Sequence, residues 1–181
     1  RSEVIDRPMV DTVERDPNPL LNANVYPKGA WVLHMLRGVV GDSAFYRGVR
    51  DYYRGYRDSS VVSGQFQRVM ERASRQDLGW FFQQWLYQPG HPRLDVAWSV
   101  EPTAPSVTLR VRQAQPEAWG RWEIPAVPVE FVRNGEVVAR RTFRLQARYA
   151  EIVATFVGIG PVDEVRVDPE GTLLITAAVG R

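Results

Sequence analysis

The residue types that most often carry out chemistry are few in this sequence. His34 and His91 are the only histidines among the 181 residues, and they lie 57 positions apart. Cysteine is absent, which excludes thiolate metal sites, disulfides and a cysteine nucleophile. The sequence contains no His-Glu-x-x-His, no Gly-x-Ser-x-Gly and no phosphate-binding loop. We therefore expect no complete zinc site and no full catalytic set from these residues alone.

The two histidines favour structural roles. His34 lies in an apolar run that is typical of a buried helix, so we expect it to be a hydrogen-bonded core residue. His91 lies between Gly90 and Pro92 in a connecting segment, where a structural or exposed side chain is expected.

Three further groups of side chains could bind a ligand. The pairs Asp163-Glu164 and Asp168-Glu170 offer oxygen ligands for calcium, but their irregular spacing favours turn carboxylates that face water. Trp119 and Trp122 flank Gly120, and we expect them to cover one end of a β-sandwich rather than to bind a ligand face. Four other aromatic residues recur at a spacing that favours a packed helical core over a ligand groove. They are Phe81, Phe82, Trp85 and Tyr87.

Composition limits the class of protein. Hydrophobic residues make up 44% and charged residues 24% of the chain, as in ordinary globular domains. The net charge of +2 is too small to indicate a nucleic acid partner, and no apolar run approaches the roughly 20 residues of a membrane span. The absence of cysteine fits a soluble cytoplasmic protein and a periplasmic or secreted one equally. Of the 23 basic residues only Lys28 is a lysine, which is typical of a codon bias towards arginine.

The first half of the chain predicts helices. An irregular, proline-interrupted arm covers residues 1–23, and helical spacing follows over 27–39, 42–56, 63–73 and 77–85. The first of these helices is apolar on all sides, so we expect it to be buried on several sides. The run Pro89-Gly90-His91-Pro92 ends the last helix.

The second half predicts strands. Alternating apolar residues mark segments 94–100, 107–112, 127–131, 136–141, 152–156, 165–167 and 173–175, and Asn134-Gly135 is a strong hairpin signal. About seven short strands are typical of an antiparallel β-sandwich. We therefore predict an α+β protein with a helical domain over residues 1–92 and a β-sandwich domain over residues 93–181.

Several motifs, in this order along the chain, resemble one peptidase family. The run Tyr26-Pro27-Lys28-Gly29 before an apolar helix resembles the helix that carries the catalytic tyrosine in gluzincin zinc metallopeptidases of the aminopeptidase-N type (membrane alanyl aminopeptidase-like). Phe81 to Leu86, followed by Gly90-His91-Pro92, is similar to the family's F-F-x-x-W-L and G-x-P elements. Trp122 to Pro125 and Val167 to Pro169 are similar to its sandwich domain.

The resemblance implies a segment of a larger enzyme. In this family a His-Glu-x-x-His motif and a downstream glutamate hold zinc, and an upstream Gly-Met-Glu-Asn loop reads the substrate amine; the 181 residues contain neither motif. The chain begins with Arg1, so we expect the C-terminal part of a thermolysin-like catalytic domain plus the sandwich, ending soon after it as in shorter bacterial members. Zinc is expected in the intact parent and not in this chain.

The resemblance also assigns roles. Tyr26 would stabilise the oxyanion during hydrolysis of N-terminal residues from peptides, while Lys28 and Gly29 would serve helix packing and electrostatics. The partners implied are a peptide substrate and the N-terminal zinc-binding part of the same polypeptide, without which the chain is expected to be inactive. Two alternatives stay open: a non-catalytic binding or scaffold module, and a pseudoenzyme with replaced zinc ligands.

Overall fold

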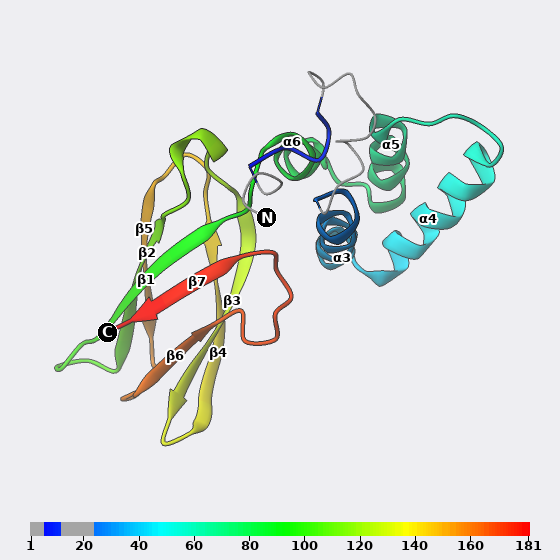
Figure 1. Ribbon diagram of the computed structural model, residues 1–181. Coiled ribbons are helices and arrows are strands. Elements are labelled where there is room, and N and C mark those ends of the chain that lie inside the picture. The colour runs from blue at the N-terminus through cyan, green and yellow to red at the C-terminus, as the bar shows by residue number, and fades with distance from the viewer. Residues whose placement is uncertain (1–5, 12–23) are drawn as a thin grey trace. The chain divides into compact units, whose positions relative to one another are not determined.

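The computed structural model describes residues 6–11 and 24–181. It divides into two compact units, Arg1–Pro89 and Gly90–Arg181, of which the first is helical and the second is built from strands (Figure 1). The fold class is α+β, as the sequence predicts, because one unit is helical and the other is built from strands. Among the described residues, no helix has the length and apolarity that crossing a membrane requires.

The helical unit contains the four expected helices within its described part. They are α3 (Gly29–Val40), α4 (Asp42–Tyr56), α5 (Ser63–Ser74) and α6 (Gly79–Tyr87). Two begin later than expected. Pro27 lies in a π-helical turn, η1 (Asn24–Lys28), that precedes α3. Asp77 lies before α6, where its carboxylate accepts a hydrogen bond of 2.8 Å from the Gly79 backbone N–H and so caps the helix from outside.

Aromatic residues connect the helices of this unit. Tyr52 of α4 lies edge-on to Phe66 of α5 at 5.0 Å between ring centroids, and Phe66 lies 6.1 Å from Phe82 of α6. Phe81 and Trp85 continue the cluster within α6 and are 1% and 2% exposed. The expectation of a packed aromatic core holds for these residues, while Tyr87 is 42% exposed.

Helix α3 is buried on one side only, which corrects the expectation of burial on several sides. Its buried residues among those described are Val32, Met35, Leu36 and Val40, whose spacing places them on one face. Leu33 is 44% exposed, and His34 is exposed with its ring against Trp31 at 5.8 Å. His34 is therefore not a core histidine, because it lies outside the face that Val32, Met35, Leu36 and Val40 bury.

The second unit is a sandwich of two sheets. Its strands are β1 (Arg93–Val100), β2 (Ser106–Gln113), β3 (Ile124–Arg133), β4 (Glu136–Leu145), β5 (Glu151–Val157), β6 (Glu164–Val167) and β7 (Thr176–Gly180). One sheet has the order β5-β2-β1-β7 and the other the order β4-β3-β6. Asn134 and Gly135 both have positive φ angles, 52° and 82°, and join β3 to β4 as the hairpin signal predicts.

The last strand differs from the prediction in place and direction. Residues 173–175 are not a strand; the strand is Thr176–Gly180, and it pairs parallel to β1, with Arg93 opposite Thr176. The reason lies in Asp168, whose carboxylate accepts hydrogen bonds from the backbone N–H groups of Thr172 at 2.9 Å and Leu173 at 3.0 Å. Because these N–H groups bond to Asp168 within a turn, the hydrogen-bonded pairing of β7 with β1 begins later, at Thr176.

One end of the sandwich is held by an amide and two tryptophans. The Gln113 Nε2 donates to the carbonyl oxygens of Trp122, Gln146 and Tyr149 at 3.1–3.3 Å, and its Oε1 accepts from the Trp122 backbone N–H at 2.8 Å. Trp119 and Trp122 are 5% and 0% exposed, so they cover the sandwich end as expected and offer no ligand face.

We expect Gly90→Ala to destabilise the sandwich unit by about 2–4 kcal/mol. Gly90 has φ +74°, and a Cβ there would lie 2.1 Å from Cε3 of the Trp119 ring, which is itself buried. Urea unfolding followed by tryptophan fluorescence measures the change. The matched control is Gly38→Ala, at an exposed helical position with no atom within 4 Å of the added carbon. The control should gain about 0.5–1 kcal/mol from helix propensity. Equal stability of the two variants would contradict the role of Gly90.

Candidate functional site

The candidate site is built around the turn that carries Tyr26. Tyr26 lies in η1, just before α3, and its side chain is 70% exposed. Pro27 is tolerated here because the first turn of a helix leaves its N–H groups without intrahelical partners. Short π-helical turns are uncommon and occur frequently at functional sites. The turn presents a phenol, whose hydroxyl can donate a hydrogen bond, at the surface of the helical unit.

Lys28 anchors the same turn from its inner side. Its side chain is 7% exposed, and its Nζ donates a hydrogen bond of 3.1 Å to the backbone carbonyl oxygen of Gln88, the C-cap residue of α6. Burial lowers the pKa of Lys28 from the usual 10.5 to about 8. The ammonium lies at a helix C-terminus, where the carbonyl groups favour a positive charge.

The segment of residues 6–11 lies near the start of α3 and bonds to the end of α6. The Val10 N–H donates a hydrogen bond of 2.9 Å to the carbonyl oxygen of Leu86, so the end of α6 is bonded by two segments that are distant in sequence. A Cβ placed on Gly29 would lie 3.4 Å from the Met9 methyl group, which shows how near this segment lies to the start of α3. The Tyr26 turn is thus held to α6 and to residues 6–11.

An apolar groove of about 570 Å³ borders Tyr26. Val25 and Tyr26 line it from η1, Leu33 from α3, and Phe66 and Phe82 from α5 and α6. Val32 and Leu36 of α3 also line the groove, so the groove places this helix beside the aromatic cluster.

Metal-ligating side chains are not gathered in the described part of the chain. No group of three or more histidine, aspartate or glutamate residues lies close enough there to hold an ion. His34 is exposed on α3, and His91 lies beside Trp119 at 6.0 Å between rings in the other unit. The described residues therefore gather no ligand set that fits a zinc site.

The candidate calcium carboxylates make contacts within the sandwich. Asp168 accepts hydrogen bonds from Thr172 and Leu173, and Asp163 accepts one of 2.7 Å from the Asn134 backbone N–H. Glu164 forms a bidentate ion pair with Arg166 at 2.8 Å, and this contact lowers the pKa of its carboxyl group. These contacts account for the carboxylates as turn and surface residues.

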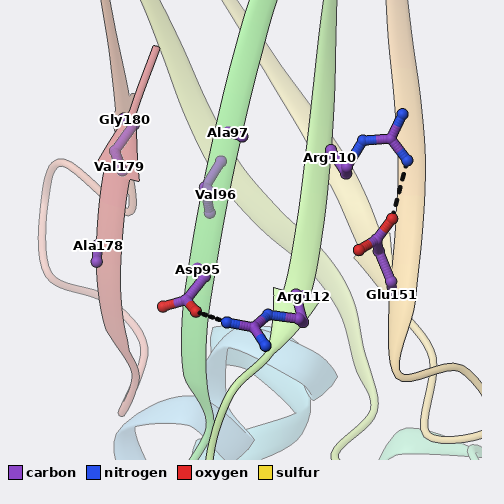
Figure 2. Close-up of a pocket in the computed structure, with 9 residues that line it drawn as sticks. All are labelled: Asp95, Val96, Ala97, Arg110, Arg112, Glu151, Ala178, Val179 and Gly180. Atoms are coloured by element: carbon purple, nitrogen blue, oxygen red, sulfur yellow. Dashed lines mark hydrogen bonds and ion pairs between the residues drawn. The ribbon is translucent and has the colours of Figure 1, made fainter.

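A shallow hollow of about 430 Å³ lies on the outer face of the β5-β2-β1-β7 sheet (Figure 2). Two cross-strand ion pairs line it, Asp95 with Arg112 and Arg110 with Glu151. Each arginine is matched by a carboxylate on the neighbouring strand, so the hollow presents balanced charge and serves sheet pairing.

The chain is similar to known peptidases in its helical unit. A family model described as the Peptidase family M1 domain matches residues 3–85, which include Tyr26, Lys28 and most of α6. The aminopeptidase N of Lactococcus lactis subsp. lactis is 34% identical over 108 residues, which are 58% of this chain and 12% of that protein. The aminopeptidase N of Escherichia coli (strain K12) is 31% identical over 99 residues, 55% of this chain and 11% of that protein.

A solved structure extends the similarity to the whole fold. The crystal structure of Legionella pneumophila aminopeptidase A in complex with aspartic acid matches 100% of this chain with a TM-score of 0.82, at 16% sequence identity, and the match covers 21% of that chain. The expected resemblance to aminopeptidase-N-type peptidases is confirmed. The chain spans 11–12% of the length of the two aminopeptidase N relatives.

The burial of Lys28 could not be located from the sequence pattern. The sequence predicts a role in packing and electrostatics in general, and the structure shows that the side chain is buried and bonds to the end of α6. The available signal was compositional, because Lys28 is the only lysine among the 23 basic residues. Lysine and arginine differ in shape and donor geometry, so they are not interchangeable at a buried position.

We expect the pKa of Lys28 to be about 8 in the folded chain. The chain has one lysine, so reductive methylation with ¹³C-formaldehyde gives one side-chain signal to titrate by NMR. The unfolded chain binds this proton with the ordinary pKa of 10.5, so protonation favours unfolding and the free energy of unfolding rises with pH between about 8 and 10.5.

The matched control for this pH dependence is Lys28→Met. The difference in unfolding free energy between wild type and variant should rise by on the order of 3 kcal/mol across that interval. The other titratable groups are the same in both proteins, so their contributions cancel in the difference. A difference that stays flat with pH would contradict the burial of the ammonium.

Proposed function

We propose that this chain is a segment of a zinc-dependent aminopeptidase, and that Tyr26 stabilises the oxyanion when an N-terminal residue is cleaved from a peptide. The observation that carries the proposal is the exposure of Tyr26 in a turn anchored to α6, within residues that match the M1 peptidase domain. The relatives named above are aminopeptidases, which supports the reaction class.

The chemistry proposed for Tyr26 is hydrogen-bond donation. Attack on a peptide carbonyl moves negative charge onto its oxygen, and a donor that is already in place stabilises this charge more than it stabilises the ground state. One such donor contributes about 3–4 kcal/mol to the transition state. Tyr26 is suited to this because its hydroxyl reaches solvent while its backbone is held to α6 through Lys28.

We further propose that the metal and the remaining substrate contacts come from elsewhere in a longer polypeptide. Zinc held by that longer polypeptide would supply Lewis-acid chemistry at the substrate. The described residues here gather no ligand set, and the chain matches about an eighth of the length of its aminopeptidase N relatives. The partners proposed are the N-terminal zinc-binding part of the same polypeptide, with a thermolysin-like fold completed by residues 1–92, and a peptide substrate.

The first test replaces Tyr26 by phenylalanine in the longer peptidase. Loss of one oxyanion donor should lower kcat by a factor of roughly 100 or more, with the zinc content unchanged. Steady-state kinetics on an aminoacyl-anilide measures the change. Tyr53→Phe is the matched control, because Tyr53 is a 68% exposed tyrosine of the same unit that does not line the groove. A kcat for Tyr26→Phe within twofold of wild type would remove Tyr26 from the mechanism and favour a binding or scaffold role.

The second test concerns the 181-residue chain by itself. It should bind no stoichiometric zinc and cleave no aminoacyl-anilide, because the proposal places the metal ligands outside it. Elemental analysis after dialysis against a weak chelator measures the zinc content. One tightly held zinc per chain, or turnover that a chelator abolishes, would contradict the proposal that the metal ligands lie outside these 181 residues.

A further inference from the structure

We propose that Lys28 is a positioning residue that sets the orientation of Tyr26 by tying the η1 turn to the C-terminal end of α6. This inference rests on the proposed function of Tyr26. It adds a second residue of this chain to the same site, one that acts through Tyr26 and not on the substrate.

The two side chains of the turn have opposite environments. Tyr26 is 70% exposed, whereas Lys28, two residues later, is 7% exposed. The turn therefore directs the phenol outwards and the ammonium inwards. The hydrogen bond of the Lys28 side chain restricts rotation of the η1 turn, and this rotation determines where the phenol oxygen of Tyr26 lies.

The attachment point of Lys28 is a rigid one. Its Nζ lies 3.1 Å from the carbonyl oxygen of Gln88, which follows directly on α6. Helix α6 is buried through Phe81, Phe82 and Trp85, and the Gln88 N–H continues its hydrogen bonding to the Gln84 carbonyl oxygen at 3.2 Å. An anchor on a well-packed helix holds a turn more closely than an anchor on a loop.

Composition indicates that the position requires lysine. The chain uses arginine at the other 22 basic positions, yet it has lysine here. A guanidinium carries five donors in a planar fork and needs several acceptors when buried, whereas an ammonium is a compact group. Because the bias towards arginine acts on the whole chain, its exception at a buried residue points to a geometric requirement.

Burial of the Lys28 charge carries a cost in stability. Burial lowers the pKa of Lys28 to about 8, which means that the folded chain holds the protonated form at a cost. The hydrogen bond to Gln88 offsets part of this cost, and a methionine of similar length would avoid it. A buried ammonium that bonds to α6 and lies two residues from Tyr26 can fix the place of that side chain, and errors near 1 Å in a reacting group cost about 100-fold in rate.

The test is a double-mutant cycle in the longer peptidase with Tyr26→Phe, Lys28→Met and the double variant. Lys28→Met should lower kcat by about 10- to 100-fold and change KM by less than about threefold. The double variant should be no slower than Tyr26→Phe alone, because a positioning residue has nothing to position once the hydroxyl is gone. Lys28→Arg should stay impaired, and Arg37→Met, which removes an exposed basic residue of α3, should stay within twofold of wild type.

The outcomes separate this inference from the proposed function. If Tyr26→Phe retains wild-type kcat, the role of Tyr26 is wrong. If Tyr26→Phe is impaired but the two losses multiply in the double variant, Tyr26 keeps its role and the positioning role of Lys28 is overturned. A loss confined to KM would overturn it as well.

A second measurement covers the case in which Lys28→Met folds poorly in the longer protein. In the 181-residue chain, ¹⁵N relaxation should show faster motion of the Val25 and Tyr26 amides in Lys28→Gln than in wild type, with the amides of α6 unchanged. Equal order parameters at Tyr26 in the two proteins would contradict the tether.

Discussion

Burial of the aromatic side chains of α6 is the constraint on which the helical unit depends. Phe81 and Trp85 are almost fully buried, and Phe82 joins α6 to α5 and α4 through Phe66 and Tyr52. A helix held in this way has a fixed C-terminal end, and its last carbonyl groups need donors. The Val10 N–H and the Lys28 ammonium supply them, so the packing of a core also determines where the Tyr26 turn lies.

The sandwich unit is organised by a separate interaction. The side chain of Gln113 bonds the backbone of Trp122 and of the segment 146–149, which ties together the two connections at one end of the sandwich. Trp119 packs over Gly90, at the first residue of the unit. The unit therefore has its own core and its own closure, and the proposed chemistry needs none of its side chains.

The sequence pattern predicts the helices and strands well where the spacing of apolar residues alone determines them. The four helices, the strands up to β6 and the Asn134-Gly135 hairpin follow from spacing and turn residues. The pattern fails where a side chain overrides it or where burial depends on distant partners. Asp168 accepts a hydrogen bond from the Leu173 N–H, so β7 begins later in the chain than the pattern predicts. His34 is exposed because α3 packs on one face only. The contact of Lys28 joins residues 60 positions apart, and no local pattern contains it.

The two units differ in how their sequences match known peptidases. The family match ends at residue 85, within α6, whereas the similarity of fold to the solved aminopeptidase covers the whole chain at 16% identity. A sandwich tolerates wide sequence change as long as apolar residues alternate and the turns close. A turn that must expose one side chain and bury a charged one two residues later tolerates much less, since each substitution changes either the donor or the anchor. The segment from Tyr26 to Lys28 therefore exposes one side chain and bonds the other to the end of α6.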